Sequence, residues 1–386
     1  MALGMLAQAL ARRMRIPGII ILLAAGLLFG PDGLNWIQPD SLGSAMHIIV
    51  GFAVAVILFE GGMNLRISRI KREQLAIQGL ITISAFITLV GGTLSTLFFL
   101  DWDFRTSILF GTLIIVTGPT VISPLLKRIR IHHGVSTILE AEGILLDAIG
   151  AIVAVVALEV AISPSGLSLL KGFYHIITRL GIGTLFGVTG GALLTLLFRI
   201  RRLVPEGLEN VFILSWVFAL FQLSNALSPE SGIAAVTIAG MTIGNSKTYI
   251  HRELLEFKEQ LTVLMIGMLF ILLAADVRLS HIYNLGINGV FTVLFLMIII
   301  RPLAVFAGTA RSKLEKKHKI LLAWIAPRGI VAAAVASLFA FELNLHGYDG
   351  SQLRALVFLL ITMTVLSAGI TGGWVAAILN LKRKSE

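Results

Sequence analysis

The chain has 386 residues, of which 56% are hydrophobic and only 13% are charged, whereas soluble domains carry about 25% charged residues. Its formal net charge of +10 is not accompanied by aromatic residues interleaved with basic ones, which argues against a nucleic-acid-binding surface. It contains no cysteine, and this excludes disulfides and thiolate metal sites. Long apolar runs from end to end predict an all-α polytopic membrane protein.

The apolar runs predict thirteen membrane spans in chain order. They cover approximately residues 1–11, 17–30, 46–63, 75–99, 106–126, 137–160, 175–198, 210–227, 231–244, 261–275, 285–310, 319–341 and 353–380. The first run is too short to cross a bilayer, which takes roughly 20 residues. We therefore interpret it either as a half-helix leaning on its neighbours or as a span of which the chain holds only part.

Basic residues cluster in the breaks that follow odd-numbered spans. These clusters hold most of the Lys and Arg residues: Arg12, Arg13 and Arg15; Arg66, Arg69, Lys71 and Arg72; Lys127, Arg128 and Arg130; Arg199, Arg201 and Arg202; Lys247, Arg252 and Lys258; Arg311, Lys313, Lys316, Lys317 and Lys319; Lys382, Arg383 and Lys384. The alternation predicts that these breaks and the C-terminus are cytoplasmic, in the cell membrane of a prokaryote. We expect no soluble regulatory domain after residue 384.

Two spans are interrupted in mid-membrane. Thr117-Gly118-Pro119 breaks the fifth span, and Ala326-Pro327-Arg328-Gly329 breaks the twelfth, because proline removes a backbone donor and disfavours helix in the residue before it. A pair of broken helices at matching places in two halves indicates the binding site of a secondary transporter. The odd number of intervening spans predicts inverted repeats at 1–162 and 207–386, joined by a linking span within 163–206.

Three acids lie in the first half of the sixth span: Glu140, Glu142 and Asp147. If this helix begins at Ser136 or Thr137, a rise of 1.5 Å per residue places Asp147 about 15 Å in, near the middle of the membrane. An acid there persists only if it pairs, binds a cation or holds a proton. A carboxylate that holds either a proton or a hard cation is a minimal exchanger, and the unwound carbonyls at Thr117 and Gly118 would supply further oxygen ligands.

Other charges lie within the spans and need partners. Glu142 is interpreted as a structural acid, with Arg328 as its candidate partner. Glu60 is either a cation ligand, an acid at the entrance, or a surface acid paired with Arg66. Arg301 needs an acid or a carbonyl, and we interpret it as structural.

Five segments together resemble the monovalent cation:proton antiporter-1 family, the NhaP-type sodium/proton exchangers. They read "LFEGGMNL", "TGPTVISPLL", "EAEGILLDAIGA", "SGIAAVTIAG" and "APRGIVAAAVASLF", and the likeness covers nearly the whole chain. The resemblance implies an NhaA-like fold of about thirteen helices and a homodimer in which a core domain moves against a dimer domain. It also implies that Asp147 is the ion-binding carboxylate, with Glu60 and the backbone at Thr117 around the cation. Glu142 and Arg328 would match the family's core-stabilising pair.

The chain departs from the family pattern at three positions near Asp147. Leu146 stands where the family usually has Asn, Gly118 where it usually has Asp, and Gly143 where it usually has Ser. These replacements leave the ion preference open. With one titratable carboxylate at depth, we expect one-for-one electroneutral exchange.

The residues therefore predict a secondary transporter that exchanges Na⁺, Li⁺ or K⁺ for H⁺ by alternating access and serves pH homeostasis. The alternative is a channel-like K⁺ efflux system of the same fold; an organic-anion symporter is disfavoured by the acids at the site. No zinc, nucleophile-elbow or P-loop motif occurs, so an enzyme is not expected. We expect no cofactor and no transition metal, only an alkali cation. Gly118, Pro119, Pro327 and Gly329 are expected to be the hinges of the two broken helices.

Overall fold

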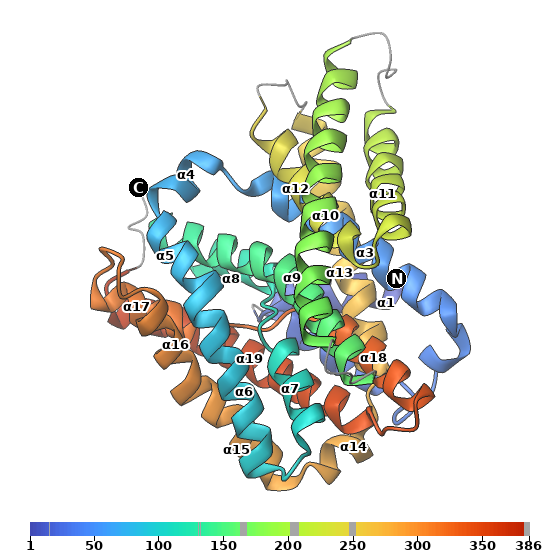
Figure 1. The fold of residues 1–386 in the computed structure, drawn as a ribbon, viewed down its shortest axis with the longest axis vertical. Coiled ribbons are helices and arrows are strands. Elements are labelled where there is room, and N and C mark those ends of the chain that lie inside the picture. Colours follow the sequence, from blue (N-terminus) through green and yellow to red (C-terminus); the bar gives the residue numbers. More distant parts are fainter. Residues whose placement is uncertain are drawn as a thin grey trace.

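The computed structural model describes residues 1–14, 16–129, 131, 133–162, 168–200, 208–246 and 252–381. The regular elements of this part of the chain are helices (Figure 1). Several predicted features lie outside it: both ends of the linking segment at 163–167 and 201–206, Lys247, and the C-terminal basic residues 382–384.

The helices follow the predicted spans in order. Their bounds are α1 Ala2–Met14, α2 Gly18–Phe29, α3 Ser44–Asn64, α4 Ile67–Arg72, α5 Gln74–Gly79, α6 Ala85–Phe99, α7 Phe104–Leu113, α8 Pro119–Ile129, α9 His133–Ile162, α10 Ser168–Arg199, α11 Glu209–Leu227, α12 Ser231–Gly244, α13 Arg252–Ala275, α14 Leu279–Asn284, α15 Gly286–Phe295, α16 Arg301–Gly308, α17 Lys316–Trp324, α18 Ile330–Leu345 and α19 Ser351–Ile378.

The predicted interruptions are confirmed. The fifth span is split into α7 and α8, and the twelfth into α17 and α18. The fourth and eleventh spans each contain a π-helical segment, Leu80–Ser84 and Leu296–Ile300, at related places in the two halves. This symmetry fits inverted repeats, although their exact boundaries stay a prediction.

The first helix, α1, has 13 residues. It leans on α13, where the Gln8 side chain donates a hydrogen bond of 2.8 Å to the Val263 carbonyl. A Cβ placed at Gly4 would lie 3.0 Å from the carbonyl carbon of Gly267, so the two backbones are nearly in contact.

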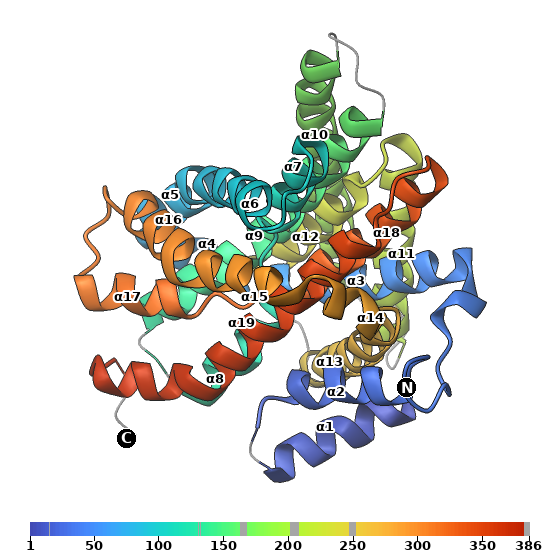
Figure 2. The ribbon, with the colours of Figure 1, turned by 90° about the horizontal axis from the view of Figure 1, so that it is seen from below.

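The helices pack into two groups (Figures 1 and 2). We call α1, α2, α3, α11, α12 and α13 the scaffold bundle, and α5 to α9 with α14 to α19 the crossing bundle, because the latter holds both interrupted helices. Helix α10 packs chiefly on α12 of the scaffold bundle and also on α9 of the crossing bundle. This long helix therefore packs against both groups.

The breaks after odd-numbered spans meet on one face of the molecule, and the breaks after even-numbered spans meet elsewhere. Lys71 and Arg72 line a cavity of about 650 Å³ together with Gly134 and Lys313, so the breaks after the third, fifth and eleventh spans share one face. We call it the basic face. On another part of the molecule, Arg105 donates a hydrogen bond of 2.6 Å to the Tyr348 hydroxyl, which joins the break after the fourth span to the one after the twelfth. This pairing is what an alternating topology requires.

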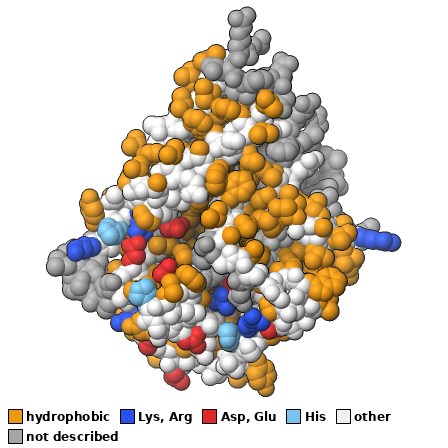
Figure 3. Space-filling view, turned by 90° about the vertical axis from the view of Figure 1, so that its right-hand side faces the viewer, with side chains coloured by type: hydrophobic (Ala, Val, Ile, Leu, Met, Phe, Trp, Pro, Cys, Tyr) orange, Lys and Arg blue, Asp and Glu red, His pale blue; other side chains and the backbone are white. Residues whose placement is uncertain are grey.

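Large hydrophobic side chains remain on the outside of the helices. Figure 3 shows them spread over much of one face of the molecule. Exposed examples are Phe98, Leu223, Ile298, Ile370 and Trp374. Apolar surface of this extent matches a protein surrounded by lipid rather than water.

Candidate functional site

The two unwound segments cross with their backbones in contact. Residues 114–118 separate α7 from α8, and residues 325–329 separate α17 from α18. A Cβ built at Gly118 would lie 2.3 Å from the Gly329 Cα, and one built at Gly329 would lie 2.2 Å from the Gly118 Cα. The crossing therefore has no room for a side chain at either position, which accounts for the glycine at position 118.

Replacing Gly118 by alanine is expected to force the two segments apart. Overpacking of this kind costs about 1–3 kcal/mol, and because it displaces the backbone that surrounds the site, cation-dependent transport should fall as well. The matched control is Gly181→Ala in α10, where an added Cβ meets nothing within 4 Å. Thermal unfolding in detergent and transport in vesicles measure both effects. Equal unfolding midpoints and equal transport rates in the two variants would contradict the tight crossing.

Asp147 lies at the centre of α9 and is completely buried. The helix begins at His133, three residues before the earliest predicted start, so the depth of Asp147 along it is greater than predicted. Neither carboxylate oxygen of Asp147 has a hydrogen-bond partner among the described residues. An ionised carboxylate in such a place is costly unless it takes a proton or a cation or lies close to a positive charge.

The first unwound segment packs against the face of α9 that carries Asp147. A Cβ at Gly150, one turn after Asp147, would lie 3.2 Å from the backbone nitrogen of Val116. The Thr117 hydroxyl donates a hydrogen bond of 3.4 Å to the Glu142 carbonyl, also on α9. The structure thus brings the predicted residues Thr117 and Gly118 to the helix that carries the buried acid.

Arg328, in the second unwound segment, reaches the first one. Its Nη1 donates to the carbonyls of Ile115 and Val116 at 3.4 Å each, and its backbone N–H donates to the Thr364 hydroxyl at 3.2 Å. The guanidinium is buried and lies near enough to Asp147 for electrostatic attraction, without a hydrogen bond between them. Arg328 therefore ties the two segments together and places a positive charge beside the carboxylate.

The predicted pairing of Glu142 with Arg328 is wrong. Glu142 instead forms a bidentate ion pair with Arg301, at 2.5 Å from Nη1 to Oε1 and 3.0 Å from Nη2 to Oε2. Arg301 also donates to the Leu322 carbonyl at 3.2 Å, so it has both kinds of partner that a deep arginine was expected to need. The physical reason is geometric, because Arg328 is held by the carbonyls of the first unwound segment while Arg301 begins α16 opposite α9.

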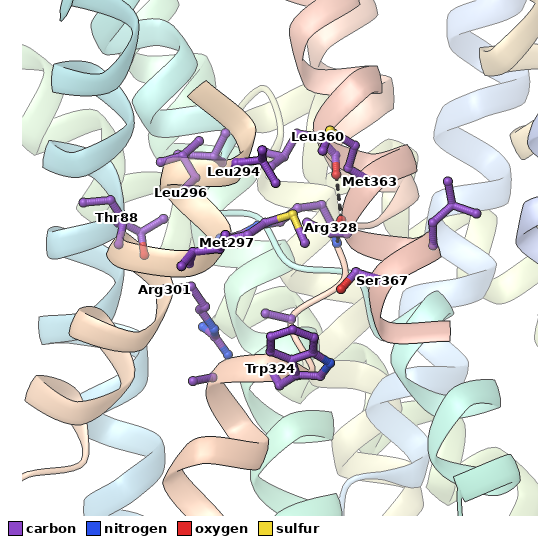
Figure 4. Close-up of a pocket in the computed structure, with 17 residues that line it drawn as sticks. Thr88, Leu294, Leu296, Met297, Arg301, Trp324, Arg328, Leu360, Met363 and Ser367 are labelled. Carbon is purple, nitrogen blue, oxygen red and sulfur yellow. Dashed lines mark hydrogen bonds between the residues drawn. The ribbon is translucent and has the colours of Figure 1, made fainter. Parts of the chain in front are cut away.

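A cavity of about 340 Å³ lies beside these arginines, within the crossing bundle (Figure 4). Arg301, Trp324 and Arg328 line it together with mainly apolar side chains from α15, α19 and the π-helical segment between α15 and α16. The Nε of Arg301 has no hydrogen-bond partner among the described residues. Asp147 is not among the lining residues, so this cavity adjoins the Glu142–Arg301 ion pair rather than Asp147.

Glu60 lies in α3 of the scaffold bundle and is half-buried. It lines a separate cavity of about 40 Å³ with Asn210 of α11 and Thr262 of α13. The next residue, Gly61, faces α9, where an added Cβ would lie 3.3 Å from Ile144. Glu60 thus lies in a helix next to α9 but makes no hydrogen bond to Asp147, and its predicted place around the cation stays a prediction.

In the described part of the chain, two unwound helices cross beside a buried carboxylate whose oxygens have no hydrogen-bond partner. This arrangement is typical of inverted-repeat secondary transporters. Residues 1–381 match the family described as "Sodium/hydrogen exchanger, transmembrane". The chain therefore belongs to the sodium/hydrogen exchanger family, as its sequence motifs suggested.

Relatives with described activities are similar along most of this chain. The K⁺/H⁺ antiporter NhaP2 of Shewanella oneidensis is 29% identical over 375 residues, which cover 95% of this chain and 63% of that protein. The chain thus spans less than two thirds of the length of NhaP2. The Na⁺/H⁺ antiporter 1 of Methanocaldococcus jannaschii is 29% identical over 358 residues, covering 89% of this chain and 82% of that protein.

A solved structure has the same fold. The sodium proton antiporter MjNhaP1 from Methanocaldococcus jannaschii, determined at pH 8, superposes with a TM-score of 0.83 at 26% identity. The alignment covers 98% of this chain and 96% of that one. The NhaA-like antiporter fold that the sequence predicted is therefore confirmed.

Proposed function

We propose that this protein exchanges a monovalent alkali cation for protons across the membrane, with Asp147 as the group that both ions share. The observation that carries this proposal is the buried carboxylate with no hydrogen-bond partner for either oxygen. Because a carboxylate holds a proton or a cation but not both at once, the two ions compete. A gradient of one ion then drives the other.

The unwound segment 114–118 supplies oxygen ligands for the cation. The Gly118 carbonyl accepts hydrogen bonds from the backbone N–H groups of Val121 and Ile122. The other carbonyls of the segment are not used up by helical hydrogen bonds to the same extent as those of an intact helix, and hard cations prefer oxygen. Arg328 takes two of these carbonyls at 3.4 Å, a distance at the long end for a hydrogen bond. The Thr117 carbonyl and Glu60 are the proposed cation ligands beside Asp147.

The charge balance of the site supports one-for-one exchange. Glu142 forms an ion pair with Arg301, so of the acids in α9 only Asp147 is both fully buried and without an ion pair or hydrogen bond to the described residues. One carboxylate can carry one proton in one direction and one alkali cation in the other. The exchange then moves no net charge, and membrane voltage leaves its rate unchanged.

A cation panel tests the proposal. The full chain is reconstituted in vesicles with an internal pH reporter, a pH gradient is imposed, and Na⁺, Li⁺ or K⁺ is added outside. We expect at least one of these ions to dissipate the gradient, with choline as the inactive control. A protein that carries K⁺ current without any proton movement would instead support the channel-like alternative. A rate that follows an imposed voltage would contradict electroneutral exchange.

The orientation and assembly follow from the same proposal. The basic face, where Lys71, Arg72 and Lys313 meet, is the cytoplasmic one by the positive-inside rule. The protein would lie in the cell membrane of a prokaryote and work as a homodimer, as the family resemblance implies.

A further inference from the structure

One partly buried ion pair joins the scaffold bundle to the crossing bundle. Asp276 directly follows α13, and its Oδ2 accepts a hydrogen bond of 2.6 Å from Nη1 of Arg354 in α19. The same oxygen accepts a bond of 2.9 Å from the hydroxyl of Ser337 in α18. One carboxylate of the scaffold bundle thus holds two helices of the crossing bundle.

Each charge of this pair sits at the unfavourable end of its helix. Asp276 lies at the C-terminal end of α13, where the helix dipole is negative, and Arg354 lies in the first turn of α19, where it is positive. The Asp276 side chain is 7% exposed and that of Arg354 is 19% exposed. Neither charge is stabilised by its own helix or fully by water, so each depends on the other.

A second contact between the bundles lies at the other end of the link from α13 to α14. Asp32, in the loop after α2, accepts a hydrogen bond of 2.5 Å from the backbone N–H of Leu279 at the start of α14. Asp276 and Leu279 flank the short link from α13 to α14, where the chain passes from one bundle to the other. This link lies in the break after the tenth span, and α19 begins in the break after the twelfth. The predicted topology places both breaks on the face opposite the basic face.

We propose that Asp276, Ser337 and Arg354 form a gate that closes the route to Asp147 from the face opposite the basic face. This inference rests on the proposed exchange by alternating access, in which the two bundles must move relative to each other. The gate is closed in this structure. Opening the site to the opposite face separates Asp276 from both partners. The Asp276–Arg354 pair forms again when the site opens to the basic face.

Crosslinking across the gate tests this inference, because the chain has no cysteine of its own. Asp276→Cys with Ser337→Cys places two short thiols where the side-chain oxygens are 2.9 Å apart. We expect oxidation to reduce cation-dependent proton exchange at least tenfold and a reductant to restore it. Failure of the bridge to form, or full exchange with the bridge formed, would overturn the gate.

The matched control stays within one bundle. Ser224→Cys with Ser231→Cys joins α11 and α12 of the scaffold bundle, where the two hydroxyl oxygens are 2.7 Å apart. Its oxidation is expected to leave exchange unchanged. If both bridged pairs lose activity equally, the loss comes from oxidation in general and the gate is not supported.

A labelling experiment separates the gate from the proposed function. Ser337→Cys is labelled from the face opposite the basic face with a membrane-impermeant maleimide, with and without Asp276→Asn and Arg354→Gln. We expect labelling to be at least tenfold faster when the pair is removed, whether or not the protein exchanges ions. Equal labelling rates would overturn the gate, whereas faster labelling without any exchange would leave the gate and refute the antiport.

Discussion

Replacing Asp147 by asparagine is expected to reduce cation-dependent proton exchange to the level of vesicles without protein. Asparagine has nearly the same shape but can neither release a proton nor balance a cation. Because Asp147 is fully buried and no hydrogen bond of the described residues depends on its oxygens, the fold should lose nothing. We therefore expect a midpoint of thermal unfolding equal to or above that of the unmodified protein.

Cation-dependent stabilisation gives a second measurement of the same residue. A ligand at 100 times its dissociation constant stabilises the folded state by about 2.7 kcal/mol, so the transported cation should raise the unfolding midpoint. Asp147→Asn should abolish this rise. The control is Glu140→Gln, about two helical turns before Asp147 on α9, which is expected to keep both exchange and stabilisation. Cation-dependent proton movement that survives Asp147→Asn would place the exchanging group elsewhere.

Breaking the Glu142–Arg301 pair is expected to be the most destabilising single change considered. Both side chains are buried, at 1% and 6% exposure, and truncating one partner leaves the other charge in a medium that solvates it poorly. Such a loss costs about 3–5 kcal/mol, which is a large part of the stability of most proteins. Glu142→Gln and Arg301→Met should therefore each lower the unfolding midpoint strongly.

A double-mutant cycle distinguishes the two arginines. Because Glu142 and Arg301 contact each other directly, combining their substitutions should cost less than the sum of the single effects, by about 0.5–3 kcal/mol. Arg328→Met should instead couple more weakly to Glu142→Gln, since Arg328 bonds to backbone carbonyls and only its charge acts on Glu142. As a control, removing the exposed Lys317–Glu315 pair should leave the unfolding midpoint unchanged. Stronger coupling of Glu142 to Arg328 would contradict the observed pairing.

The membrane spans and their interruptions could be predicted from the sequence because they depend on local properties. Hydropathy over about 20 residues decides whether a segment enters the bilayer, and a proline such as Pro119 or Pro327 breaks a helix wherever it lies. Asp147 was identifiable for the same reason. An acid far from either end of an apolar helix is costly in any arrangement of the other helices, so its position alone indicates a function.

Partners across helices could be decided only by the tertiary structure. Glu142 and Arg301 are 159 positions apart in the chain, and the hydropathy pattern fixes neither the rotation nor the relative depth of their helices. The sequence offered two deep arginines for one structural acid. The fold resolved the choice because the second unwound segment carries Arg328 onto the carbonyls of the first, leaving Glu142 to Arg301.

The contact between Asp276 and Arg354 was likewise beyond the sequence, since each looks like an ordinary charge at the end of a span. By itself the sequence determined which segments enter the membrane, where two of them unwind and which acid lies deep within them. Each of these features depends on the free energy of one segment alone. Only the tertiary structure decided which charges neutralise each other and where the two bundles are joined, because those energies depend on distances between segments that the sequence does not encode locally.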